Sequence, residues 1–201
     1  MLGMFWASKG WRMKDQYFSR ALGWFRRWPV GLLLLLMVFG GCQAKEPTLS
    51  PAAVSFKKEI RNYLQRLSQG LTAPLAEGDL PAVNKFLNRV EPEAVKLCRM
   101  CPFHLGVLNK DGVTLTVHPY NVAALGNFSN YEVVVQTLKN QKINQQRFFL
   151  QDGSQIYIVC DPILKGDKLL GILALSLSAQ EAKQRWGLTE KEFLAINFNK
   201  S

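Results

Sequence analysis

Apolar residues recur every three or four positions after residue 50, with charged and amide side chains between them. This pattern indicates an amphipathic helix with one buried face. Ser50-Pro51 supplies a capping hydroxyl and then a proline suited to the first helical turn. We therefore predict a helix over residues 51–72. Its apolar positions are Phe56, Ile60, Tyr63, Leu64, Leu67 and Leu71.

A second amphipathic helix is predicted to begin at Asp79. Glu91-Pro92 is expected to interrupt it, because a proline disfavours helical backbone at the residue before it. The positions expected to face inward are Leu80, Val83, Phe86, Leu87 and Val90.

Short apolar segments with strand-like composition follow the second helix. Turn signals separate them at Asp111-Gly112, at Asp152-Gly153 and at residues 165–167. Because the last two turns join consecutive segments, the last three strands should form an antiparallel meander. The predicted strands are residues 103–109, 113–118, 146–151, 155–163 and 168–178.

Three S/T-x-x-E patterns predict further helix starts. The first, Ser129 to Glu132, would cap a helix that runs to about Asn140. The others, at residues 178–181 and 189–192, would open short helices near the end of the chain. The order of elements predicts an α+β domain, with a five-stranded antiparallel sheet covered by helices.

The beginning of the chain has the pattern of an export signal. Residues 1–29 are basic, and an apolar run of 12 residues follows at 30–41, which is too short to span a bilayer as a stable helix. Phe39-Gly40-Gly41-Cys42 resembles the bacterial lipobox, which implies a signal peptide at 1–41, a diacylated Cys42 and a polar tether at 42–50. A plain membrane anchor with an incidental cysteine is the alternative.

Charge and motifs narrow the function classes. The chain has 25 basic and 15 acidic residues, of which residues 1–41 hold 6 and 1, so the remainder carries only +5. No basic cluster with interleaved aromatic residues indicates nucleic acid. No nucleophile elbow, P-loop, dinucleotide-binding or zinc-protease motif is present, and the chain has two histidines. We expect no enzymatic activity and no cofactor.

Three cysteines follow the tether. Outside the cytoplasm a C-x-x-C pair usually oxidises, so we expect a Cys98–Cys101 disulfide with Cys160 as a buried strand residue. Pairing of Cys160 with either of the other two is a second option. A metal site formed by Cys98, Cys101, His104 and Cys160 is a third, because three sulfurs and an imidazole suit zinc. A redox-active thiol pair is the fourth.

Several ordered features resemble the Cache domain, an extracellular PAS-like sensor module of bacteria. The resemblance implies a single Cache domain at residues 51–201, with a long N-terminal helix and a helix and loop over the ligand face. The matching features are Lys110-Asp111-Gly112, His118-Pro119, Leu125-Gly126, Tyr131, Asp152-Gly153, Asp161-Pro162-Ile163 and Gly171.

The resemblance also implies a ligand, such as a short carboxylate or an amino acid. Arg147 could bind a carboxylate with its planar fork, although strand alternation could equally turn it to solvent. Tyr157 could line a pocket or pack against the long helix. The positions that match family ligand contacts are His118, Tyr120, Tyr131, Arg147, Tyr157 and Asp161.

The chain departs from most Cache proteins because no second apolar span follows the domain. We expect it to be held outside the cytoplasm by its lipid and to signal through a membrane partner, or to act as a binding protein. Gln43 after the lipidated cysteine slightly favours the outer membrane. The alternatives are a redox or metal-binding lipoprotein, and an interaction lipoprotein with a collapsed pocket.

Overall fold

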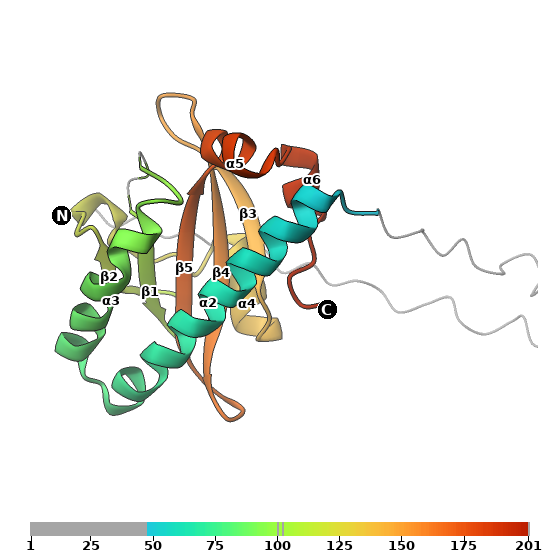
Figure 1. Ribbon diagram of the computed structural model, residues 1–201. Helices are drawn as coiled ribbons and strands as arrows, with labels where there is room; N and C mark the ends of the chain where they lie inside the picture. Colours follow the sequence, from blue (N-terminus) through green and yellow to red (C-terminus); the bar gives the residue numbers. More distant parts are fainter. Residues whose placement is uncertain (1–47, 100, 102, 201) are drawn as a thin grey trace, which may run out of the picture. The chain divides into compact units, whose positions relative to one another are not determined.

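The computed structural model describes residues 48–99, 101 and 103–200 (Figure 1). Residues 47–201 form one compact unit, and both clusters of buried residues lie between Ala53 and Phe198, so this part of the chain contains a complete core. The predicted signal peptide and Cys42 lie outside the described residues. Among those described, no helix is long and apolar enough to cross a membrane.

The helices and strands follow the predicted order. Strand boundaries agree with the prediction to within about two residues, and the predicted strand at 168–178 is confirmed unchanged. The elements are α2 (Pro51–Glu77), α3 (Leu80–Ala94), β1 (Leu105–Asn109), β2 (Thr114–His118), η1 (Val122–Ala124), α4 (Glu132–Asn140), β3 (Asn144–Phe149), β4 (Gln155–Lys165), β5 (Lys168–Ser178), α5 (Ala179–Trp186) and α6 (Glu190–Ala195).

The five strands form one antiparallel sheet in the order β2-β1-β5-β4-β3. The predicted meander of the last three strands is confirmed, and β5 continues the sheet by pairing with β1. Helix α2 crosses one face of this sheet and α4 lies on the other (Figure 1). The α+β prediction with a five-stranded antiparallel sheet is therefore confirmed.

The N-terminal helix is longer than predicted. The Ser50 hydroxyl accepts a hydrogen bond from the Ala53 amide at 3.2 Å, and the helix ends at Gly78, which adopts φ 71°. It continues through Pro74, which lies in the last turn and removes only one backbone hydrogen bond there. Leu75 in this extension packs against the core, which favours the added turn.

The predicted interruption at Glu91-Pro92 is wrong, because α3 continues through Pro92 to Ala94. Pro92 again lies in the last turn, where a missing amide costs little, and the fully buried Ala94 holds the end of the helix. Val83 and Leu87 are buried as predicted, but Leu80 is 39% exposed.

The predicted cap at Ser129 is also wrong. Tyr131 is the N-cap of α4, without a side-chain hydrogen bond, and the helix begins at Glu132. The Gln146 side-chain oxygen, on β3, accepts from the Val133 amide at 3.1 Å instead. A contact from the next strand in the chain thus replaces the local cap that the sequence pattern indicated.

The two caps near the end of the chain differ. Thr189 and Glu192 form the complete reciprocal capping box. At α5 the Ser178 hydroxyl accepts from the Glu181 amide, but the Glu181 carboxylate accepts from the Arg99 amide at 3.0 Å. Glu181 therefore links α5 to the segment after α3.

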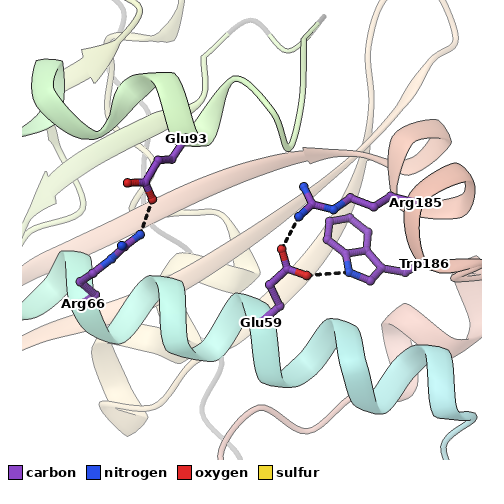
Figure 2. A network of polar contacts seen from close by, with 5 residues as sticks. All are labelled: Glu59, Arg66, Glu93, Arg185 and Trp186. Atoms are coloured by element: carbon purple, nitrogen blue, oxygen red, sulfur yellow. Dashed lines mark hydrogen bonds and ion pairs between the residues drawn. The ribbon is translucent and has the colours of Figure 1, made fainter.

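Polar contacts hold α2 against its helical neighbours (Figure 2). Arg66 pairs with Glu93 at the end of α3. Glu59 accepts from Arg185 at 2.5 Å and from the Trp186 indole at 2.9 Å, both at the end of α5. These contacts lie over a closely packed core, in which the Phe56 ring lies 5.1 Å from that of Trp186.

Candidate functional site

A cavity of about 250 Å³ lies between the sheet and α4. Its floor contains a row of small residues in register on three adjacent strands: Gly106 on β1 faces Ala174 on β5, which faces Cys160 on β4. Val133 and Val134 of α4 lie over this floor. Because these three residues have small side chains or, at Gly106, none, they do not fill the distance to α4, and space remains between the two layers.

Aromatic side chains form the wall and the opening of the cavity. The Tyr131 ring lies 5.3 Å from Phe128 and 5.7 Å from Phe148. Tyr131 and Phe149 both line the cavity, and they are 43% and 59% exposed. These two residues therefore lie where the cavity meets solvent.

The polar residues that line the cavity are all of uncharged types. The Thr114 hydroxyl donates to the Ala124 carbonyl at 3.5 Å. The Cys160 thiol is buried, and this burial raises its pKa to about 12, which favours the protonated form. The polar lining residues are Thr114, Asn121, Tyr131 and Cys160.

Four of the six predicted ligand contacts lie on the opposite face of the sheet, under α2 and α3. Arg147 is paired across β3 and β4 with Tyr157, which stacks on Phe193 at 3.9 Å between ring centroids. Arg147 itself forms an ion pair with Glu190 of α6. Both residues are thus occupied by the C-terminal helices and do not contact the cavity.

The other two residues on that face have internal partners as well. His118 Nε2 lies 3.2 Å from the Asn84 side-chain oxygen of α3, and burial lowers the pKa of His118. The Ser68 hydroxyl of α2 donates to Asp161. Burial raises the pKa of Asp161, and the hydrogen bond from Ser68 opposes this rise.

The remaining two predicted contacts, Tyr120 and Tyr131, lie in the segment between β2 and α4. Tyr120 is 71% exposed on the loop after β2 and does not line the cavity, whereas Tyr131 does. The structure therefore brings only Tyr131, of the six, to the cavity. Sequence reasoning missed the floor residues Gly106 and Ala174, whose signal was small size within otherwise bulky strands.

The predicted Cys98–Cys101 disulfide is confirmed, with the two Cα atoms 5.6 Å apart. Cys160 is free and buried, as expected for that pairing. Since the two sulfurs are bonded to each other, they are not available as thiolate ligands. His104 Nδ1 lies 3.8 Å from a Glu91 carboxylate oxygen, and the described residues contain no cluster of three or more metal-binding side chains.

A second cleft, of about 630 Å³, lies on the other side of the sheet between α2 and its helical neighbours. Its charged lining includes the Arg66–Glu93 and Glu59–Arg185 pairs of Figure 2. These charges already satisfy one another, so the cleft offers fewer free groups to a ligand than its size suggests.

Comparison with known proteins places the fold but gives no close relative. No protein-family model matches the chain, and no curated protein matches it. Among solved structures, the ligand-binding domain of the Pseudomonas aeruginosa PAO1 amino acid chemoreceptor PctB, in complex with L-Arg, is 13% identical. Its TM-score is 0.51, over 66% of this chain and 54% of that chain.

Two further structures have the same fold. The extracellular domain of vpHK1S-Z8, assigned as a histidine kinase, is 16% identical with a TM-score of 0.55, over 70% of this chain and 57% of that one. A Vibrio parahaemolyticus domain assigned to the sensory box/GGDEF family is 13% identical with a TM-score of 0.51, over 70% and 60%. This chain thus spans less than two thirds of each of these chains, and its described residues adopt the PAS/Cache-like fold of sensory domains.

Proposed function

We propose that residues 47–201 are an extracytoplasmic sensor domain that binds a small molecule in the cavity between the sheet and α4. The cavity itself carries this proposal, because it lies directly against the sheet, whereas the cleft on the opposite side lies between helices and is lined by charges that pair with each other. PctB, which has the same fold, is a chemoreceptor domain in complex with an amino acid. The cavity also argues against an interaction protein with a collapsed pocket.

Lipid attachment through Cys42 completes the proposal. Two acyl chains would hold the domain stably at a membrane surface. The ligand-bound state would then be read by a membrane partner that contacts the domain from outside, since acyl chains transmit no conformational change across a bilayer. A soluble delivery or buffering role would use the same cavity without such a partner.

Thermal unfolding of residues 47–201 with a library of amino acids, carboxylates and uncharged metabolites tests the binding function. A ligand present at a hundredfold excess over its Kd stabilises the native state by about 2.7 kcal/mol. We expect a raised Tm with at least one compound, and loss of this rise in Ala174→Leu, which fills the cavity floor. A Tm rise that persists in Ala174→Leu, or no rise with any compound, contradicts the proposal.

Fractionation of cells that express the whole chain tests the anchor. The wild-type protein should be found with membranes and should incorporate labelled palmitate, and Cys42→Ser should lose the label. Cys160→Ser is the matched control, because its thiol is buried in the sheet. Unchanged labelling of Cys42→Ser would exclude lipidation at this cysteine.

A further inference from the structure

Charge is absent from the side chains that line the α4-side cavity. Each of its lining residues is apolar or of an uncharged polar type. An amino acid brings an ammonium and a carboxylate, and burial of either group without a partner is costly. A cavity built to bind such a ligand needs charged or strongly polar partners that this one does not have.

Two groups near the cavity could attract an anion, the Arg147 side chain and the amides at the N-terminus of α4, and both already have partners within the protein. Arg147 lies on the other face of β3, in an ion pair with Glu190. At the N-terminus of α4, the Val133 amide donates to Gln146, and the Val134 and Val135 amides donate to the Tyr131 carbonyl. These amides, which would otherwise attract a carboxylate, have internal acceptors.

The approach to the cavity is apolar as well. Tyr131 and Phe149 lie at its opening. The loop beside them, which contributes Asn121 and Ala124 to the lining, also exposes Val122 and Leu125. The Arg147 guanidinium lies over the Phe149 ring, 4.7 Å from its centroid, and its charge is compensated by Glu190. The other surfaces that a ligand meets here are mostly hydrocarbon, which favours molecules that leave water readily.

The volume sets the size of the part of a ligand that the cavity can bury. An engineered protein cavity of roughly 150 Å³ accommodates benzene. By the same scale, a cavity of about 250 Å³ holds a molecule of roughly ten non-hydrogen atoms. A bicyclic aromatic ring or a chain of about eight carbons has this size.

We infer that the ligand of this domain is an uncharged, predominantly apolar molecule of about this size, held by Gly106, Ala174 and the aromatic wall rather than by a charged clamp. This inference rests on the proposed function and narrows it. It also separates the chain from PctB, whose structure contains L-Arg. The carboxylate or amino acid implied by the sequence resemblance would lack its partner here, because Arg147 is on the opposite face.

Matched probe pairs test the inference by isothermal titration calorimetry on residues 47–201. 1-Octanol is compared with octanoate, which has the same chain length and differs in charge, so this pair isolates the effect of charge. Indole is compared with L-tryptophan, which adds a charged amino acid group to the same ring and therefore differs in both size and charge. We expect the uncharged probe of each pair to bind at least tenfold more tightly than its charged counterpart. L-Arginine, the ligand in the PctB structure, should not bind.

Variants locate the binding. Ala174→Leu should weaken indole and 1-octanol binding at least tenfold, whereas Ala73→Leu, the same change on the exposed side of α2, should leave it unchanged. Gly106→Ala provides a milder test that does not threaten folding, because the new Cβ would lie 3.6 Å from the nearest side-chain atoms. It should weaken binding by a smaller factor.

The outcomes separate the inference from the proposed function. If L-tryptophan or octanoate binds as tightly as its partner and Ala174→Leu abolishes this, the binding function stands and the ligand class is wrong. If no probe of either kind binds, the inferred ligand class is overturned, and the proposed function falls with it only if no compound of the thermal-unfolding library raises the Tm either. If indole and 1-octanol bind equally well to Ala174→Leu and Gly106→Ala, they bind outside the cavity and the inference fails.

Discussion

On the α2 side of the sheet, large side chains pack directly against the strands and the remaining cleft lies between the helices, whereas on the α4 side small residues leave a cavity against the sheet itself. Tyr157 and Phe193 stack on the first side, and the Phe56 ring contacts three other aromatic rings there. Across the sheet, Gly106, Ala174 and Cys160 form the row beneath α4. A single sheet thus carries a structural face and a candidate binding face.

The two faces also differ in their polar groups, because charged residues lie next to the sheet on the α2 side but not around the cavity. On the α2 side, Arg147, His118 and Asp161 each have a protein partner and add specificity to the packing of helices on the sheet. On the α4 side the lining contains no charged residue. The charged residues that the sequence offered as ligand contacts therefore lie away from the proposed binding face.

The largest expected contrast comes from one substitution made on both faces. Leu175→Ala removes a fully buried side chain from the α2-side core, and we expect a loss of about 3–5 kcal/mol in the free energy of unfolding. Leu108→Ala changes a residue that already borders the cavity and has fewer neighbours to lose, so the expected loss is about 2–3 kcal/mol.

Urea unfolding of both variants, with equal m values as the control for comparable unfolded states, measures this difference. An equal or larger loss for Leu108→Ala would show that the α4 side is packed as tightly as the α2 side.

Glycine substitutions sharpen the contrast in packing. A Cβ at Gly171 would run into the backbone carbonyl oxygen of Leu108, so Gly171→Ala should cost about 1–3 kcal/mol. A Cβ at Gly106 meets only ordinary contacts, and Gly106→Ala should stabilise by about 0.4–1 kcal/mol because it restricts the unfolded chain. Thermal unfolding of the two variants compares them directly, and a destabilised Gly106→Ala would mean that the cavity floor cannot accept even a methyl group.

The order of elements could be predicted because it depends on local patterns. Helical spacing in α2 and the Asp-Gly turns lie within a few residues of the structure that they specify. The errors at Pro92 and Ser129 arose where tertiary contacts override a local signal: buried Ala94 extends α3, and Gln146 caps α4.

The cavity and the proposed binding face could not be predicted from these patterns. Strand β4 is buried on both faces, so its sequence shows no hydrophobic alternation to indicate which residues lie under α2. Tyr157 and Asp161 do share a face of the sheet, but it is the face that α2 covers and not the face that borders the cavity. The small-residue row depends on the register between β1 and β5, which are far apart in the chain, and no local signal fixes that register.

Asp161→Asn tests whether the buried carboxylate on the α2 side lowers the stability of the domain at neutral pH. Burial raises the pKa of Asp161, so its contribution to stability is complete below the unfolded value of 3.8 and is lost as the pH rises through the folded pKa. Asparagine keeps the acceptor for Ser68 without the charge, and it should stabilise the domain at pH 7 by on the order of 1 kcal/mol. Melting curves at pH 7 and pH 4 should show this advantage shrinking in acid, and an advantage that grows in acid would contradict the assignment.

The smallest effect is expected at Arg147, the one strand residue that the sequence offered as a carboxylate-binding group. Its ion pair with Glu190 is partly exposed, with side chains 32% and 38% accessible, so Arg147→Ala should cost about 0.2–1 kcal/mol. Glu190→Ala and the double variant complete a cycle that isolates the pair. Arg147 lies on the α2 side of the sheet and the cavity on the other side. The affinity for a ligand in the cavity should therefore be the same in Arg147→Ala and in wild type. A tenfold loss of affinity in this variant, without a matching loss in Glu190→Ala, would place the ligand on the α2 side and reverse the assignment of the two faces.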